Sequence, residues 1–134
     1  MTRAASLLFS LVAYAIFFAT FLYLIVFVGD IPIAGQTVDR GPDAPIATAV
    51  LIDVALIALF GLQHSIMARQ WFKRAWTRTV PEHLKRSTYV LAASVALIVM
   101  FLFWRPIPDV IWDVTGTASE LPLWILFACG WLIV

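Results

Sequence analysis

Residues 63–89 read Q-H-S-I-M-A-R-Q-W-F-K-R-A-W-T-R-T-V-P-E-H-L-K-R-S-T-Y, and this stretch decides the fold. It holds six of the nine Lys and Arg residues and both histidines, and long apolar runs flank it on either side. Lys and Arg residues that adjoin membrane-spanning segments are retained on the cytoplasmic side of the bilayer. The stretch therefore predicts a cytoplasmic connector between two transmembrane helices. Because two helices precede it, the amino terminus is expected on the cytoplasmic side as well.

The composition of the whole chain excludes a soluble protein. Of its 134 residues 63% are hydrophobic and 13% are charged, against about 45–50% and about 25% in an average soluble domain. A soluble chain of this length has too large a surface for its volume to hide so much apolar area. The expected fold class is all-α, a polytopic transmembrane helical bundle that forms a single domain over residues 1–134.

The apolar runs predict three full spans and the start of a fourth. The first three are long enough to cross a hydrocarbon core of about 30 Å. The fourth has only 14 residues and is too short, so we expect the chain to be the amino-terminal portion of a longer protein. The first run is too long for a signal peptide and lacks a cleavage site. The predicted spans cover residues 4–28, 45–68, 87–104 and 121–134.

Residues 69–86 predict an interfacial segment that contacts membrane lipid. Residues 69–78 place aromatic side chains at helical spacing with Lys and Arg between them, which is typical of an amphipathic helix in the headgroup layer. Its position between two spans excludes a nucleic-acid partner. Glu82, which follows this helix, is expected to pair with Lys85 or Arg86.

Two further residues lie inside apolar runs. Asp53 is about 12 Å along the second predicted helix, below the headgroups, where a charge normally faces the bundle interior or a water-filled cavity. Cys129, the single cysteine, is expected to behave as a small buried hydrophobic residue.

The candidate catalytic residues are Gln63, His64 and Arg69, at the cytoplasmic end of the second helix. If the second and third helices are antiparallel neighbours, these residues meet the polar start of the third helix, residues 86–89, at one membrane depth. A histidine there could accept a proton near neutral pH, and an arginine could hold an anion. The alternative is that these polar side chains only hydrogen-bond between helices and fix their depth. No metal-ligand spacing or Gly-rich phosphate loop is present.

Four segments resemble the bacterial methanethiol S-methyltransferase family, which is grouped with NnrU-type membrane proteins and distantly with isoprenylcysteine carboxyl methyltransferases. The segments are L-I-D-V-A-L-I-A-L-F-G-L-Q-H-S-I-M-A-R, F-K-R-A-W-T-R, R-S-T-Y-V-L-A-A-S and W-R-P-I-P-D-V-I-W-D-V-T-G. The resemblance extends over the whole chain, and Q-H-S-x-M-A-R is its most specific part.

The resemblance implies an enzyme of the bacterial inner (cytoplasmic) membrane that transfers a methyl group from S-adenosylmethionine to methanethiol, giving dimethyl sulfide. Members of the family are about twice as long as this chain. In the related carboxyl methyltransferases the cofactor is held by the carboxyl-terminal half. No cofactor-binding residue is therefore assigned, and we expect neither bound S-adenosylmethionine nor activity from this chain alone.

Two alternatives remain open. The chain could be an NnrU-like membrane protein without enzymatic activity, acting in assembly or interaction. It could also be a complete product that needs a partner chain in place of the missing half.

Overall fold

The computed structural model describes residues 3–33, 35–77, 79–107, 109–110 and 113–134. Over these residues helices are the only regular secondary structure, joined by loops. Three of the helices are long and apolar enough to cross a membrane, and the third includes a short 3₁₀ turn, η1, at its start. The predicted all-α transmembrane bundle is thereby confirmed. The elements in chain order are α1 (Arg3–Val28), α2 (Ile46–Ala68), α3 (Gln70–Trp76), η1 (Glu82–Leu84), α4 (Lys85–Phe103) and α5 (Glu120–Ile133).

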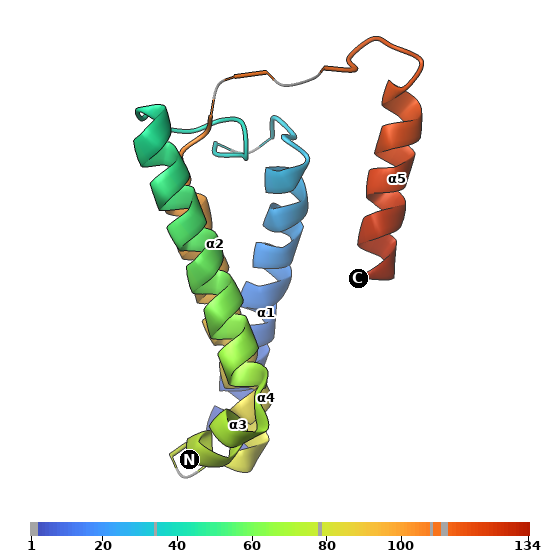
Figure 1. Ribbon diagram of the computed structural model, residues 1–134. Helices are drawn as coiled ribbons and strands as arrows, with labels where there is room; N and C mark the ends of the chain where they lie inside the picture. The colour runs from blue at the N-terminus through green and yellow to red at the C-terminus, as the bar shows by residue number, and fades with distance from the viewer. Residues whose placement is uncertain (1–2, 34, 78, 108, 111–112) are drawn as a thin grey trace.

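Helix α4 is the centre of the bundle, because it packs against both α1 and α2. Figure 1 shows the start of α1, the end of α2, α3 and the start of α4 together at one end of the molecule, which we call the connector end. The loops that leave α1 and α4 meet at the opposite end, the loop end. Helices α1 and α4 therefore run parallel to each other, and α2 runs antiparallel to both.

Small residues allow α1 and α4 to approach each other. The buried residues of α1 recur at intervals of seven, which keeps them on one face of the helix, and three of them are small. Small side chains at helix contacts in membranes let the backbones come close. At the connector end the Ser87 hydroxyl of α4 donates to Ser10 Oγ of α1 at 2.9 Å. The small members of the α1 stripe are Ser6, Ala13 and Thr20.

Large residues fill the bundle toward the loop end. The aromatic rings of Phe27 on α1 and Phe101 on α4 have centroids 5.0 Å apart, and Leu56 of α2 belongs to the same buried cluster. The loops are tied to this core by side chains. The indole of Trp104 donates to the carbonyl of Val38 at 3.0 Å, and the Tyr23 hydroxyl donates to a carbonyl of the first loop at 2.7 Å.

Asp53 faces the bundle interior, as its position in the sequence predicted. It is only 6% exposed, and its Oδ1 accepts the backbone N–H of Arg105 at 2.9 Å. Arg105 follows the end of α4, so the carboxylate joins α2 to the loop that leaves α4.

The elements near the connector differ in detail from the sequence-based expectation. The helix expected from residue 69 begins at Gln70, because Arg69 has an extended backbone (φ −69°, ψ 143°) that separates α2 from α3. Arg78, assigned to the same amphipathic segment, lies outside the described residues. Helix α4 begins at Lys85 rather than Ser87, and Glu82 pairs with Lys85 at 3.4 Å.

The expectation that Cys129 is buried is wrong, because this residue is exposed. Helix α5 stands beside the bundle (Figure 1) and meets α1 through aromatic side chains. The rings of Phe21 and Trp131 have centroids 5.5 Å apart in an edge-on arrangement. Cys129 lies on a part of α5 that these contacts leave uncovered.

Candidate functional site

His64 and Tyr89 meet between α2 and α4 near the connector end. The Tyr89 hydroxyl lies 3.0 Å from Nδ1 and 3.1 Å from Nε2 of His64, and the ring centroids are 5.4 Å apart. Phe60, one turn earlier on α2, contacts the imidazole ring with centroids 5.5 Å apart. His64 precedes the end of α2 by one turn, and Tyr89 follows the start of α4 by one turn. Their antiparallel packing therefore brings them to one level.

The tautomer of His64 decides which of its nitrogens bonds the Tyr89 hydroxyl. A neutral imidazole has one N–H donor and one acceptor nitrogen, and the Tyr89 hydroxyl lies within reach of either. The hydroxyl is nearly equidistant from the two nitrogens, so the distances do not select the one that it bonds. His64 is exposed on the surface of the helices.

Gln63 and Arg69 do not join this pair. The Gln63 amide donates to Met67 Sδ at 3.0 Å within α2, and its Oε1 is buried without a hydrogen-bond partner among the described residues. The Arg69 carbonyl accepts the Lys73 N–H at 3.0 Å and so begins α3. The Arg69 side chain is exposed and forms no hydrogen bond or ion pair to the part of the chain that the structure describes.

Tyr89 is the one residue of the 86–89 segment that reaches His64. Ser87 instead bonds Ser10 of α1, and the Thr88 hydroxyl donates to the Leu84 carbonyl at 2.9 Å. The sequence shows that these residues share the start of a helix. It does not show how that helix is rotated about its axis, and this rotation decides that Tyr89, rather than Ser87 or Thr88, contacts His64.

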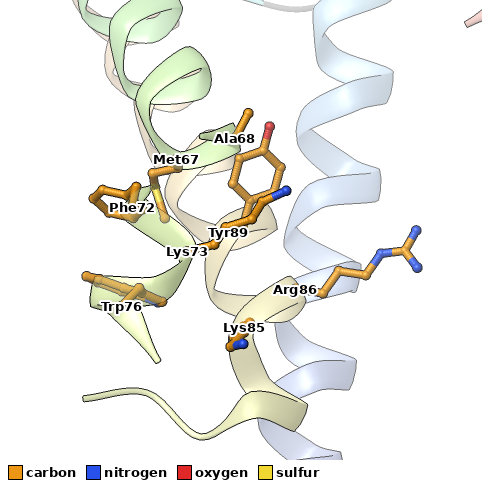
Figure 2. Close-up of a pocket in the computed structure, with 8 residues that line it drawn as sticks. All are labelled: Met67, Ala68, Phe72, Lys73, Trp76, Lys85, Arg86 and Tyr89. Carbon is orange, nitrogen blue, oxygen red and sulfur yellow. The ribbon is translucent and has the colours of Figure 1, made fainter. Parts of the chain in front are cut away.

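A pocket of about 410 Å³ lies directly beside the pair at the connector end. Figure 2 shows Phe72 and Trp76 of α3 along one wall, with Tyr89 of α4 opposite. Among the residues that the structure describes, three cations and no carboxylate contribute to its lining. These described lining residues are Met67, Ala68, Phe72, Lys73, Trp76, Lys85, Arg86 and Tyr89.

Trp76, which contributes to the lining of this pocket, has an unsatisfied donor. Its indole Nε1 is buried, and no described residue accepts a hydrogen bond from it. A buried donor without an acceptor costs roughly 1–3 kcal/mol.

The second histidine forms a separate contact. His83 Nε2 lies 3.1 Å from Ser6 Oγ, beside a hollow of about 520 Å³ that Arg3 also lines. The adjacent carboxylate of Glu82 pairs with Lys85 and does not orient the imidazole. The Ser6–His83 contact joins η1 to α1, and no described residue supplies the third group that a nucleophilic serine arrangement requires.

The chain is similar to several methanethiol S-methyltransferases. It is 47% identical to the methanethiol S-methyltransferase of Mycobacterium tuberculosis over all 134 of its residues, which make up 54% of that protein. It is 45% identical to methanethiol S-methyltransferase 1 of Bradyrhizobium diazoefficiens over 95% of the chain and 44% of that protein. The chain thus spans about half the length of the curated relatives it matches.

A more distant similarity links the chain to human nurim, with 36% identity over 72% of the chain and 37% of that protein. No family model and no solved structure matches the chain.

Proposed function

We propose that the chain forms the amino-terminal membrane portion of an enzyme that methylates methanethiol to dimethyl sulfide, because it is similar to methanethiol S-methyltransferases over all or nearly all of its residues. The match of all 134 residues at 47% identity is the observation that carries the proposal. The His64–Tyr89 pair supplies a group suited to the reaction, because it places an accessible imidazole where a small thiol would meet the membrane surface.

In this proposal His64 prepares the thiol for methylation. The nucleophilic form of a thiol is the thiolate, so a group that accepts the thiol proton increases the reactive fraction near neutral pH. His64 accepts that proton on one nitrogen while the Tyr89 hydroxyl holds the imidazole through the other. Methanethiol is small and uncharged before it loses the proton, so an apolar bundle admits it.

We propose S-adenosylmethionine as the methyl donor of the full-length protein. The pocket beside Tyr89 does not fit this cofactor, because Lys73, Lys85 and Arg86 line it and no carboxylate does. The sulfonium and ammonium groups of the cofactor are cations, and three like charges disfavour them. Its binding groups are therefore expected outside these residues, and this chain alone is not expected to bind it.

The proposed setting is the inner (cytoplasmic) membrane of a bacterium. Six of the nine Lys and Arg residues lie in the connector, which supports a cytoplasmic connector end and a cytoplasmic amino terminus. The imidazole would then face the compartment in which methanethiol and methyl donor are present.

A chimeric enzyme tests the proposal. Residues 1–134 replace the matched segment of the Mycobacterium tuberculosis protein, and membranes are assayed for dimethyl sulfide formed from methanethiol and S-adenosylmethionine. We expect the chimera to be active. His64→Ala should lower kcat/KM by about 100-fold, the lower end of general base contributions, and the loss should shrink as rising pH generates thiolate without a base.

His83→Ala is the matched control, since His83 contacts Ser6 and lies away from Tyr89; its kcat/KM should change less than about twofold. Unchanged efficiency of the His64→Ala chimera, at equal abundance in the membrane, would remove His64 from the mechanism. An abundant chimera that forms no product would instead favour a non-enzymatic, NnrU-like membrane protein.

A further inference from the structure

The pocket between α3 and α4 combines positive charge with an apolar wall. Lys73, Lys85 and Arg86 contribute to its lining, together with the aromatic rings of Phe72 and Trp76. Lys85 is partly neutralised by Glu82 at 3.4 Å, whereas Lys73 forms no ion pair with any described residue. Figure 2 shows the Arg86 guanidinium directed away from the aromatic wall. Neither Lys73 nor Arg86 has a counter-charge among the described residues, and Lys73 is the one of the two that lies on α3 with the aromatic wall.

The pocket also lies at the depth of lipid headgroups. It is built where α2 ends and α4 begins, and both helices are long and apolar enough to cross a membrane. The short helix α3 carries the aromatic residues that favour the boundary between hydrocarbon and water. A ligand here would meet water on one side and acyl chains on the other.

From these features we propose that the pocket binds the phosphodiester headgroup of an anionic phospholipid such as phosphatidylglycerol. The headgroup supplies the negative charge that Lys73 lacks, and the aromatic side chains of Phe72 and Trp76 contact the first part of its acyl chains. The acyl chains continue along the apolar surface of the spans. This assignment does not depend on the proposed methyl transfer.

The charge of the pocket argues against other ligands of similar size. A cationic or zwitterionic headgroup brings a positive group against three lining cations. A free phosphate ester satisfies the charge but leaves the apolar wall of Met67, Phe72 and Trp76 without a partner. An anionic lipid satisfies both parts of the pocket.

Native mass spectrometry of the full chain in detergent tests the assignment by titration with phosphatidylglycerol and, separately, phosphatidylcholine. Both lipids carry a phosphodiester, but only the first has a net charge. We expect phosphatidylglycerol to bind at least about fivefold more tightly, the effect of about one lysine at an anionic surface. Glycerol 3-phosphate at millimolar concentration should not displace it.

Paired variants locate the site. Lys73→Gln should weaken phosphatidylglycerol binding about fivefold, whereas Arg74→Gln removes the same charge from α3 outside the pocket lining and should change it less than about twofold. Trp76→Ala removes an aromatic side chain from the pocket lining, and it should also weaken binding. Trp71→Ala, at a residue that is 63% exposed and outside this lining, should not.

Three results would overturn the proposal. Equal losses for Lys73→Gln and Arg74→Gln would indicate general attraction to a basic surface. Equal affinity for the two lipids would remove the requirement for net negative charge. Displacement by glycerol 3-phosphate would assign the pocket to a soluble phosphate ester in place of a lipid.

Discussion

At the residue scale, Asp53 shows how a charge is accommodated inside an apolar helix. Helix α4 ends at Phe103, and Trp104 turns the chain into an extended conformation (φ −54°, ψ 140°). The next backbone N–H, that of Arg105, points into the bundle and is paired with Asp53 Oδ1. A buried polar group without a partner is costly, so the carboxylate and the amide stabilise each other's position.

For Asp53 we predict that its acceptor oxygen contributes more to the stability of the fold than its negative charge does. Asp53→Ala removes the only acceptor that the described residues offer to the Arg105 N–H and should lower the free energy of unfolding by about 1–3 kcal/mol. Asp53→Asn retains an acceptor oxygen and should lower it less. The measurement is unfolding of the purified chain in mixed micelles of increasing SDS content.

Asp43→Ala serves as the control, because Asp43 is exposed in the first loop and a surface change of this kind is usually worth no more than about 0.5 kcal/mol. If Asp53→Ala were as stable as the control, the buried carboxylate would have no structural role in joining α2 to the loop that follows α4.

At the scale of elements, the contact between α1 and α4 depends on the seven-residue recurrence of small side chains. Ala13 has no exposed surface and lies midway between Ser6 and Thr20 on the buried face of α1. Inside a membrane the apolar character of a side chain does not drive helices together, because lipid is equally apolar; close packing and hydrogen bonds do. The contact between α1 and α4 therefore requires small side chains on this face of α1.

Enlarging this face should separate the helices. Ala13→Leu forces extra volume between α1 and α4 and should destabilise the bundle by about 1–3 kcal/mol. Ala15→Leu makes the same change on an exposed face of α1 and should stay within about 0.5 kcal/mol of the parent. Both are measured by unfolding in SDS-containing micelles. Equal effects of the two variants would show that α1 is held by its hydrophobicity and not by close packing.

At the scale of the whole molecule, charge is divided between the two ends. The connector end carries most of the Lys and Arg residues, and the first loop carries three aspartates and a single arginine. This division predicts one orientation in the membrane, with the connector in the cytoplasm.

Labelling of single cysteines tests that orientation. In a Cys129→Ala background, Gly35→Cys places a thiol on an exposed loop residue with open space around it, and Ala75→Cys places one on the exposed side of α3. A membrane-impermeant maleimide added to intact cells should label position 35 and not position 75, and both should react after permeabilisation. Reaction of both in intact cells would contradict an odd number of spans between them.

The sequence by itself determined the helical, membrane-spanning character of the chain. Bilayer thickness imposes a minimum length on an apolar helix, and backbone groups in lipid must be satisfied within the segment, so runs such as 4–28 have few alternative structures. The interior position of Asp53 follows from the same physics, because the cost of exposing a carboxylate to lipid does not depend on the details of packing.

Only the tertiary structure decided which polar groups meet. The rotation of α4 about its axis brings Tyr89 to His64 and turns Ser87 toward α1, whereas the Arg69 side chain is exposed and joins neither contact. The exposure of Cys129 likewise depends on how α5 stands beside α1. Hydropathy and length determine that a segment forms a helix and spans the membrane. They do not determine which side of the helix faces a neighbour, because successive side chains point in directions about 100° apart around the axis. Which face meets a neighbour is therefore settled by close packing between segments far apart in the chain.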